Sequence, residues 1–207
     1  MKLFLSSAVN ALSLIGTILP NKGKNAKIIF IENASDNYSV DKWWVREDKE
    51  VFEKMGCELI FIDLRTISVA DLSKQLDSSD VIHFSGGSVL YLISLIKKMN
   101  LREVLVKAVK SGKIIYSGTS AGSMITSKDL SLSSYDDEDT ELLKGMDEFS
   151  GLGLVDFFII PHTNNKDFLK SDIQMIENLR NHLQPLIFID DSKAVLVDGD
   201  KFKILTI

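Results

Sequence analysis

The feature that most constrains this fold is a regular alternation between short apolar runs and longer segments with helical periodicity. The runs predict strands over Lys2–Ser6, Lys27–Glu32, Glu58–Asp63, Asp80–Phe84, Lys113–Ser117, Leu154–Ile160 and Leu186–Asp190. Their hydrophobicity is continuous rather than alternating, which is typical of central strands in a parallel sheet covered on both faces. Two later runs, Ala194–Val197 and Phe202–Thr206, flank Asp198-Gly199-Asp200 and predict a closing antiparallel hairpin.

Segments between these runs carry apolar residues at helical spacing. The stripes are Val89-Leu92-Ile93-Ile96, Leu101-Leu105-Ala108 and, as the most regular, Leu169-Ile173-Ile176-Leu179-Leu183. Pro185 is predicted to end the last of these helices, and the segment around Trp43-Trp44 is also predicted to be helical. The sequence therefore predicts an α/β fold, a three-layer sandwich with a mostly parallel central sheet.

Length and composition narrow the class of protein. The 207 residues predict a single domain spanning 1–207, and 45% apolar with 26% charged residues is typical of a soluble globular protein. A net charge of −5 gives no basic surplus, so neither nucleic acid nor a membrane surface is an expected partner. With Cys57 as its single cysteine the chain forms no internal disulfide, and with three histidines we expect no metal or cofactor. These features predict a cytoplasmic protein.

The first twenty residues offer an alternative, because Met1–Pro20 resembles a signal peptide in having Lys2 before a largely apolar stretch. Several serines and Asn10 interrupt that stretch, and the residues after it make a poor cleavage site. We therefore expect Lys2–Ser6 to be a buried strand and Ala8–Leu19 to be a helix or an ordered loop.

The predicted strand Lys113–Ser117 leads into Gly118-Thr119-Ser120-Ala121-Gly122, a G-x-S-x-G sequence followed by a helix. In this context the pattern predicts a nucleophile elbow, in which a tight turn lifts the Ser120 hydroxyl clear of the sheet. The Ala121 N–H would then lie beside that hydroxyl, where it could bind a developing oxyanion. The alternative is a glycine-rich turn without chemistry.

A second glycine-rich turn, Ser85-Gly86-Gly87-Ser88, follows the predicted strand Asp80–Phe84 and precedes a helix. Paired glycines there expose backbone N–H groups that could hold a phosphate or complete an oxyanion hole. The chain has neither G-x-G-x-x-G nor a Walker lysine, so a nucleotide site is disfavoured.

A serine nucleophile needs a base, and His162 is the candidate because it follows the strand Leu154–Ile160 at the same edge of the sheet. His83 lies within an apolar run and is predicted to be a core histidine, whereas His182 lies in a polar helix ending. For the orienting carboxylate, spacing leaves Asp190, Asp191 and the acidic run Asp136–Asp139 open. Adjacent strand residues point in opposite directions, so only one of Asp190 and Asp191 can face His162.

Taken together, these motifs resemble the aspartyl dipeptidase (peptidase E) family of serine peptidases, whose architecture is shared with cyanophycinases and class I glutamine amidotransferase domains. The resemblance runs over nearly the whole chain and is carried by Leu3–Ser7, Phe84-Ser85-Gly86-Gly87, Gly118–Gly122, Ile160-Pro161-His162-Thr163-Asn164 and Ile189-Asp190-Asp191 before Ala194–Val197. It implies that Ser120 is the nucleophile, His162 the base and Asp191 the third member, with Gly87 and Ala121 forming the oxyanion hole.

The chain also departs from the family pattern. The usual G-G-N-T reads Gly86-Gly87-Ser88-Val89, and the usual glutamate is shortened to Asp191. The family's arginine after the P-H segment, associated with an aspartyl substrate side chain, has no counterpart before Arg180. A preference for N-terminal aspartate is therefore not supported. Lys166 or Lys170 could replace the arginine as a point charge, and Ser88 and Lys166 are the substrate-binding candidates.

The resulting hypothesis is a serine peptidase that hydrolyses small peptides or related amides through Ser120, His162 and Asp191. Cyanophycinase-like or esterase activity on the same residues, or a catalytically silent relative that binds a small ligand, are the alternatives. Cys57 is a weaker nucleophile candidate, because it leads into a strand rather than out of one. The sequence leaves the oligomeric state open, with a homodimer as one alternative.

Overall fold

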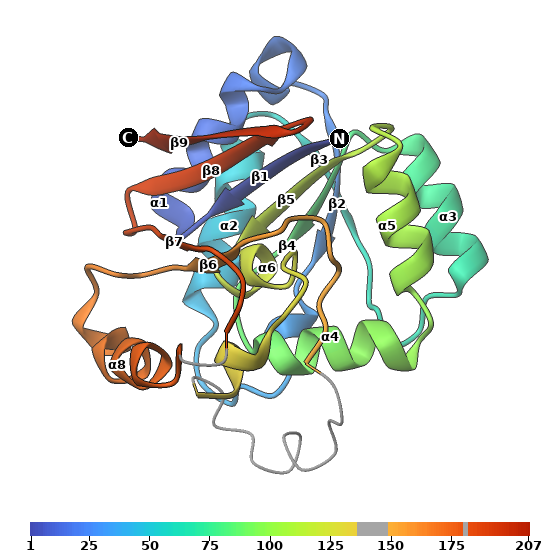
Figure 1. Ribbon diagram of the computed structural model, residues 1–207. Helices are drawn as coiled ribbons and strands as arrows, with labels where there is room; N and C mark the ends of the chain where they lie inside the picture. Colours follow the sequence, from blue (N-terminus) through green and yellow to red (C-terminus); the bar gives the residue numbers. More distant parts are fainter. Residues whose placement is uncertain (136–148, 180–181) are drawn as a thin grey trace.

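The computed structural model describes residues 1–135, 149–179 and 182–207 of the chain. Its main sheet has seven strands in the order β3-β2-β4-β5-β1-β8-β9 (Figure 1). In that order the strands are β3 (Glu58–Phe61), β2 (Lys27–Ile31), β4 (Val81–Phe84), β5 (Ile115–Thr119), β1 (Lys2–Ser6), β8 (Lys193–Asp198) and β9 (Lys201–Thr206). The first five pair in parallel, whereas β8 and β9 are antiparallel additions at one edge. The predicted mostly parallel α/β sandwich with a C-terminal hairpin is confirmed.

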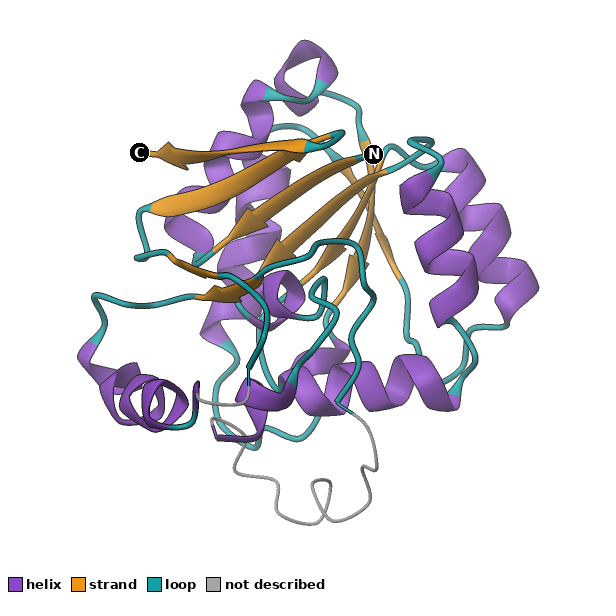
Figure 2. Cartoon of the chain, in the orientation of Figure 1, coloured by secondary structure: helices purple, strands orange, loops and turns teal. Residues whose placement is uncertain are grey.

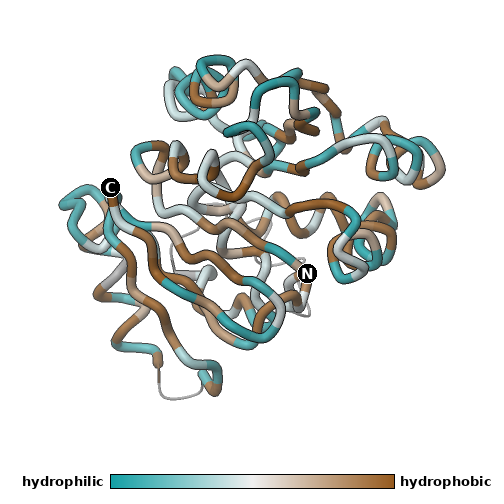
Figure 3. Tube along the Cα trace, turned by 90° about the horizontal axis from the view of Figure 1, so that it is seen from above, coloured by the Kyte–Doolittle hydropathy of each residue, from teal (hydrophilic) through white to brown (hydrophobic). Residues whose placement is uncertain are grey.

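Helices cover both faces of this sheet (Figure 2). One face packs against α1 (Val9–Leu12), η1 (Ser13–Thr17) and α2 (Trp43–Lys54). The other packs against α3 (Val69–Ser78), α4 (Val89–Lys98), α5 (Arg102–Lys110) and α6 (Ala121–Met124). Phe4 belongs to the first core and its neighbours Leu3 and Leu5 to the second, because successive strand side chains point to opposite faces. The trace in Figure 3 is accordingly brown along much of the strands.

The first twenty residues are part of this framework. β1 is a central strand between β5 and β8, and α1 and η1 follow it, as expected for Lys2–Ser6 and Ala8–Leu19. The short 3-10 helices η2 (Pro20–Gly23) and η3 (Asn33–Ser35) flank β2. No helix in the described part of the chain combines the length and the apolarity needed to cross a membrane.

Two predicted strands lie outside the main sheet. β6 (Phe158–Ile160) and β7 (Leu186–Phe188) pair in parallel with each other as a separate two-stranded sheet. They do not extend the main sheet beside β1, because β8 already pairs along that side. In Figure 1 this small sheet lies beyond the carboxyl end of β1. The segments that follow β6 and β7 are therefore carried over the ends of the central strands.

The helix predicted from Leu169 to near Pro185 differs from expectation. After η4 (Ser131–Tyr135) and η5 (Lys166–Phe168), α8 covers only Leu169–Glu177. Most of its predicted apolar stripe is exposed, including Ile173 and Ile176, while Met175 is buried. In α8 the buried side chain is Met175, which is not part of the predicted stripe, whereas the stripe residue Leu179 packs against the core beyond the end of the helix. Periodicity therefore identified the helix but not its buried side.

Candidate active site

Ser120 lies in a strained turn between β5 and α6. Its backbone angles are φ 51° and ψ −112°, a conformation that L-residues rarely adopt. The glycines on either side make this turn feasible. A Cβ on Gly118 would lie 2.3 Å from main-chain atoms of Gly122, and a Cβ on Gly122 would lie 2.0 Å from the Phe84 oxygen. The G-x-S-x-G sequence therefore forms the predicted elbow at the carboxyl edge of the sheet.

His162 and Asp191 lie beside Ser120 in one chain of hydrogen bonds. His162 Nε2 is 2.9 Å from Ser120 Oγ, and His162 Nδ1 is 2.6 Å from Asp191 Oδ1. His162 follows β6 and Asp191 follows β7, so the small parallel sheet brings both side chains over the end of β5. The hydroxyl, imidazole and carboxylate thus meet at one site although they lie far apart in the sequence.

The structure also distinguishes the two neighbouring aspartates. Asp191 faces His162, whereas Asp190 turns the other way and pairs with Lys193 and with the Ser192 N–H. The Lys193 ammonium lowers the pKa of Asp190 to about 2. The acidic run Asp136–Asp139, the other sequence alternative, lies outside the described residues. Of the two adjacent carboxylates, Asp191 is the one placed to orient the imidazole.

Ser7 joins this group, and the sequence analysis gave it no role. Its Oγ donates to Asp191 Oδ1 at 3.0 Å and accepts the His162 backbone N–H at 2.7 Å. Asn164 Oδ1 accepts the Asp191 backbone N–H at 3.1 Å, which ties the two loops together. A serine directly after the central strand β1 was the signal available in the sequence, since that position must lie at the same edge as Ser120.

Phe168 covers one face of the His162 imidazole. The two rings stack with centroids 4.3 Å apart and an interplanar angle of 16°. His162 is 9% exposed and has a backbone φ of 60°, so packing and hydrogen bonds hold an uncommon conformation. Stacking and the two hydrogen bonds together fix the ring in the orientation that faces Ser120.

Electrostatics keep Asp191 ionised. Its hydrogen bond from His162 lowers the pKa of the carboxyl below the usual value, and the Ser7 hydroxyl adds to this effect. Partial burial opposes the shift without reversing it. An ionised Asp191 can stabilise the imidazolium that forms when His162 accepts a proton.

Gly87 and Ala121, the predicted oxyanion donors, flank the elbow. Gly87 has φ 143°, and a Cβ there would lie 2.2 Å from the Ala34 oxygen, so this position requires glycine. Ser88 N–H donates to that same oxygen at 2.8 Å. Within residues 1–135, 149–179 and 182–207, neither the Gly87 nor the Ala121 amide donates to a main-chain carbonyl.

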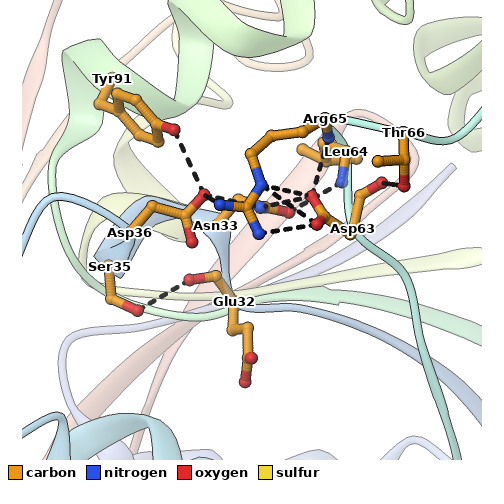
Figure 4. Close-up of polar contacts among 9 residues, drawn as sticks. All are labelled: Glu32, Asn33, Ser35, Asp36, Asp63, Leu64, Arg65, Thr66 and Tyr91. Atoms are coloured by element: carbon orange, nitrogen blue, oxygen red, sulfur yellow. Dashed lines mark hydrogen bonds and ion pairs between the residues drawn. The ribbon is translucent and has the colours of Figure 1, made fainter.

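A polar network holds the loop that carries Ala34 (Figure 4). The Asn33 amide donates to Asp36 at 2.8 Å and to Asp63 at 3.0 Å, and Asn33 Oδ1 accepts the Leu64 N–H at 2.9 Å. Arg65 pairs with Asp63 at 2.7 Å and lowers the pKa of that carboxyl to about 2. Because the Ala34 carbonyl lies against Gly87, this network fixes the glycine turn that follows β4.

The remaining candidates lie in different settings. Ser88 caps α4, because its Oγ accepts the Tyr91 N–H at 3.1 Å, and Lys166 is exposed in η5, two residues before Phe168. His83 is fully buried, as predicted for a core histidine. His182 lies beyond the end of α8, with Nδ1 3.3 Å from Asp129 Oδ2 and its side chain 2% exposed.

Cys57 lies directly before β3, at the amino-terminal edge of the sheet and away from Ser120. Burial raises the pKa of its thiol, which lowers the thiolate fraction that a nucleophile needs. Among the described side chains, no three His, Cys, Asp or Glu residues gather as a metal-binding group.

Comparison with known proteins identifies the family that carries this arrangement. The family model for peptidase family S51 matches residues 5–205. The chain belongs to peptidase family S51. As a member of S51 it is a serine-type peptidase, and the resemblance to peptidase E stated from the sequence is confirmed.

Individual S51 relatives match over most of the chain. An uncharacterised peptidase of Pasteurella multocida is 29% identical over 201 residues, covering 96% of this chain and 94% of that protein. A Streptomyces coelicolor peptidase E is 31% identical over 148 residues, covering 68% of this chain and 58% of that protein. The crystal structure of a Listeria monocytogenes protein described as a peptidase E superposes with a TM-score of 0.87 at 23% identity. The superposition covers 100% of this chain and 98% of the Listeria chain. This last match shows the shared fold.

Proposed function

We propose that this S51 peptidase hydrolyses small peptides, with Ser120 as nucleophile, His162 as general base and Asp191 as the residue that orients the imidazole. The observation that carries the proposal is the unbroken hydrogen-bond chain from Ser120 Oγ through both ring nitrogens of His162 to Asp191. Such a chain activates a serine that is otherwise a weak nucleophile.

The reaction proceeds in two steps. Ser120 Oγ attacks the peptide carbonyl while His162 Nε2 takes the hydroxyl proton, and the Gly87 and Ala121 amides bind the resulting oxyanion. Collapse of this intermediate breaks the C–N bond, and His162 passes the proton to the leaving amine. Water, deprotonated by His162, then attacks the acyl-enzyme, and the proton returns to Ser120 as the acid product leaves.

Two further residues are proposed to meet the substrate. Lys166 is exposed in η5, two residues before the Phe168 ring that stacks on His162, which supports a role for it in attracting a carboxylate of a small peptide. Ser88 follows the oxyanion glycine directly, so its position next to the bound acyl group would limit substrate size there.

The test is labelling with a fluorophosphonate probe, combined with a panel of dipeptides, β-linked aspartyl peptides and p-nitrophenyl esters. We expect covalent modification mapped to Ser120 by peptide mass spectrometry and hydrolysis of at least some dipeptides. The Ser120→Ala variant should be neither labelled nor active. If only the β-linked peptides or only the esters were cleaved, that class would replace small peptides as the proposed substrate. If the probe did not label the wild-type protein, the remaining explanation would be a catalytically silent protein that binds a small ligand.

A further inference from the structure

An aromatic cluster lies against the turn after β4, next to Ser120. Trp44, in the first turn of α2, donates its Nε1–H to the Gly86 oxygen at 3.1 Å. The position that a Cβ on Gly86 would occupy lies 3.4 Å from Ser120 Cβ and 3.5 Å from Trp44 Cδ1. The indole and the nucleophile therefore flank the same glycine from two sides.

Two more aromatic rings extend this surface. Tyr38 and Trp43 each meet Trp44 edge to face, with ring centroids 5.6 Å and 5.9 Å away. Tyr38 is 41% exposed and Trp43 is 53% exposed, so both present large apolar areas to solvent. One exposed aromatic residue needs no explanation, but two exposed rings that pack on Trp44, next to the turn at Gly86, offer an apolar surface to a substrate.

This surface is rigidly attached to the sheet. Asp48, one helical turn after Trp44, is fully buried and lies 3.2 Å from His83 Nε2 in β4. Because residues four apart share a helix face, this contact fixes the face of α2 that carries Trp44. The aromatic cluster is therefore formed before a substrate arrives.

The order of strands places this cluster on one side of the reaction. β5, which leads to Ser120, lies between β4, which leads to Gly86, and β1, which leads to Ser7. His162 is tied to Ser7, so the imidazole lies on the β1 side and Trp44 on the β4 side. The imidazole protonates the leaving amine, and that half of the peptide must approach from the β1 side. The residue that supplies the attacked carbonyl faces Trp44.

The cations on α2, and Arg65 after β3, are already paired with carboxylates of this chain. Arg65 is paired with Asp63 at 2.7 Å and lies 3.6 Å from Asp36, while Lys49 pairs with Glu32 at 2.6 Å. Arg46 likewise pairs with Asp41. An acidic substrate side chain would have to compete with these carboxylates for a cation, whereas an apolar side chain would bury area against the rings.

We propose that Trp44, with Tyr38 and Trp43, forms the subsite for the acyl-side residue, and that this residue is large and apolar, with aromatic residues preferred. The inference rests on the proposed peptidase function and names its substrate class.

The experiment measures kcat/KM on dipeptides that share a leaving alanine and differ in the acyl residue: Phe-Ala, Leu-Ala, Ala-Ala and Asp-Ala. We expect Phe-Ala and Leu-Ala to exceed Ala-Ala by about 10- to 100-fold in the wild type. The Trp44→Ala change should remove most of that advantage, so that the ratio of kcat/KM for Phe-Ala to that for Ala-Ala falls toward 1, since alanine reaches little of the rings.

Two further variants separate the subsite from the fold. Trp44→Phe lacks the hydrogen bond to Gly86 but retains an aromatic face, so it should preserve the Phe-to-Ala preference. Trp43→Ala, at the exposed edge of the cluster, should reduce that preference by a few-fold and serves if Trp44→Ala does not fold. Enlarging the leaving residue, as in Ala-Phe, should give a ratio of kcat/KM to Ala-Ala that is the same in the wild type and in Trp44→Ala.

The outcomes distinguish the two proposals. Fastest cleavage of Asp-Ala, or an unchanged Phe-to-Ala ratio in the folded Trp44→Ala and Trp43→Ala variants, would overturn the aromatic subsite. Ala-Ala hydrolysis and Ser120 labelling would in that case still support the peptidase. If the wild type neither cleaved any of the peptides nor was labelled at Ser120, the peptidase proposal and this inference would both be overturned.

Discussion

Two serines at β5 each contact a histidine, and each histidine in turn contacts an aspartate. Ser117 lies within β5, and Ser120 directly follows the end of this strand. At the candidate active site, Ser120 is 2.9 Å from His162, which is 2.6 Å from Asp191. Within the core, Ser117 Oγ is 3.0 Å from His83 Nδ1, and His83 Nε2 is 3.2 Å from Asp48. The same three residue types thus occur twice, and the two serines lie three residues apart along the chain.

The two groups differ in access and in backbone geometry. Ser117 and His83 are register partners in regular parallel strands, and both are fully buried, with the His83 ring against Phe30 and Phe52. Ser120 instead occupies a strained turn at the edge of the sheet. A substrate carbonyl needs room beside the hydroxyl and donors for its oxyanion, and only the edge supplies both. The buried group braces α2 against the sheet.

The largest expected difference between the groups concerns the two serines. Ser120→Ala should lower kcat by about 10⁴- to 10⁶-fold, because the nucleophile, base and orienting acid act as a unit. Ser117→Ala should leave kcat/KM within about 3-fold in the folded protein, since this hydroxyl meets no substrate. Steady-state peptide hydrolysis by both purified variants checks this. Equal losses would mean that the two groups are not functionally distinct.

The next difference concerns the aspartates. Asp191→Asn should lower kcat by about 10⁴-fold, because an amide can donate to His162 Nδ1 and so stabilise the tautomer that cannot accept the serine proton. Asp48→Asn is the matched control, and the folded variant should keep its kcat within about 3-fold. The readout is kcat for one dipeptide. If Asp48→Asn lowered kcat as much as Asp191→Asn does, the assignment of Asp191 as the residue that orients His162 would be contradicted.

A third comparison measures stability instead of rate. Asp48→Ala should lower the free energy of unfolding by about 3 kcal/mol, since it removes a buried partner and leaves His83 Nε2 without its acceptor. Asp77→Ala, at the exposed ion pair with Lys113, should change it by less than about 1 kcal/mol. Urea denaturation of both variants provides the numbers. If the two changes were equal, the buried group would not brace α2.

The smallest expected effect is the pH dependence contributed by Asp191. Its pKa is lowered in the folded state, mainly by the hydrogen bond from His162, so the unfolded chain binds more protons in acid. Its contribution to stability should therefore be complete above about pH 4 and be lost as the pH falls through the lowered value. Unfolding of the wild type and of Asp191→Asn, compared between pH 2 and pH 7, should converge only at the acid end. A difference that is constant across this range would exclude the proposed linkage.

Much of this could be predicted from local sequence. A strand, two glycines and a serine specify the elbow, because the tight turn admits no Cβ at Gly118 or Gly122. Continuous apolar runs specified the parallel strands, although β6 and β7 proved to form their own sheet. The buried face of α8 was predicted incorrectly, since regular spacing shows where a face is apolar and not which side meets the body of the protein.

The sequence by itself determined the α/β class, the elbow at Ser120 and the candidate base His162, because each depends on backbone geometry and periodicity within a short segment. Only the tertiary structure decided that Asp191 rather than Asp190 faces the imidazole, that Ser7 holds both, and that Ala34 requires a glycine at position 87. Those contacts join segments that are distant in the chain, and their distances follow from how strands and loops pack, which no local pattern encodes.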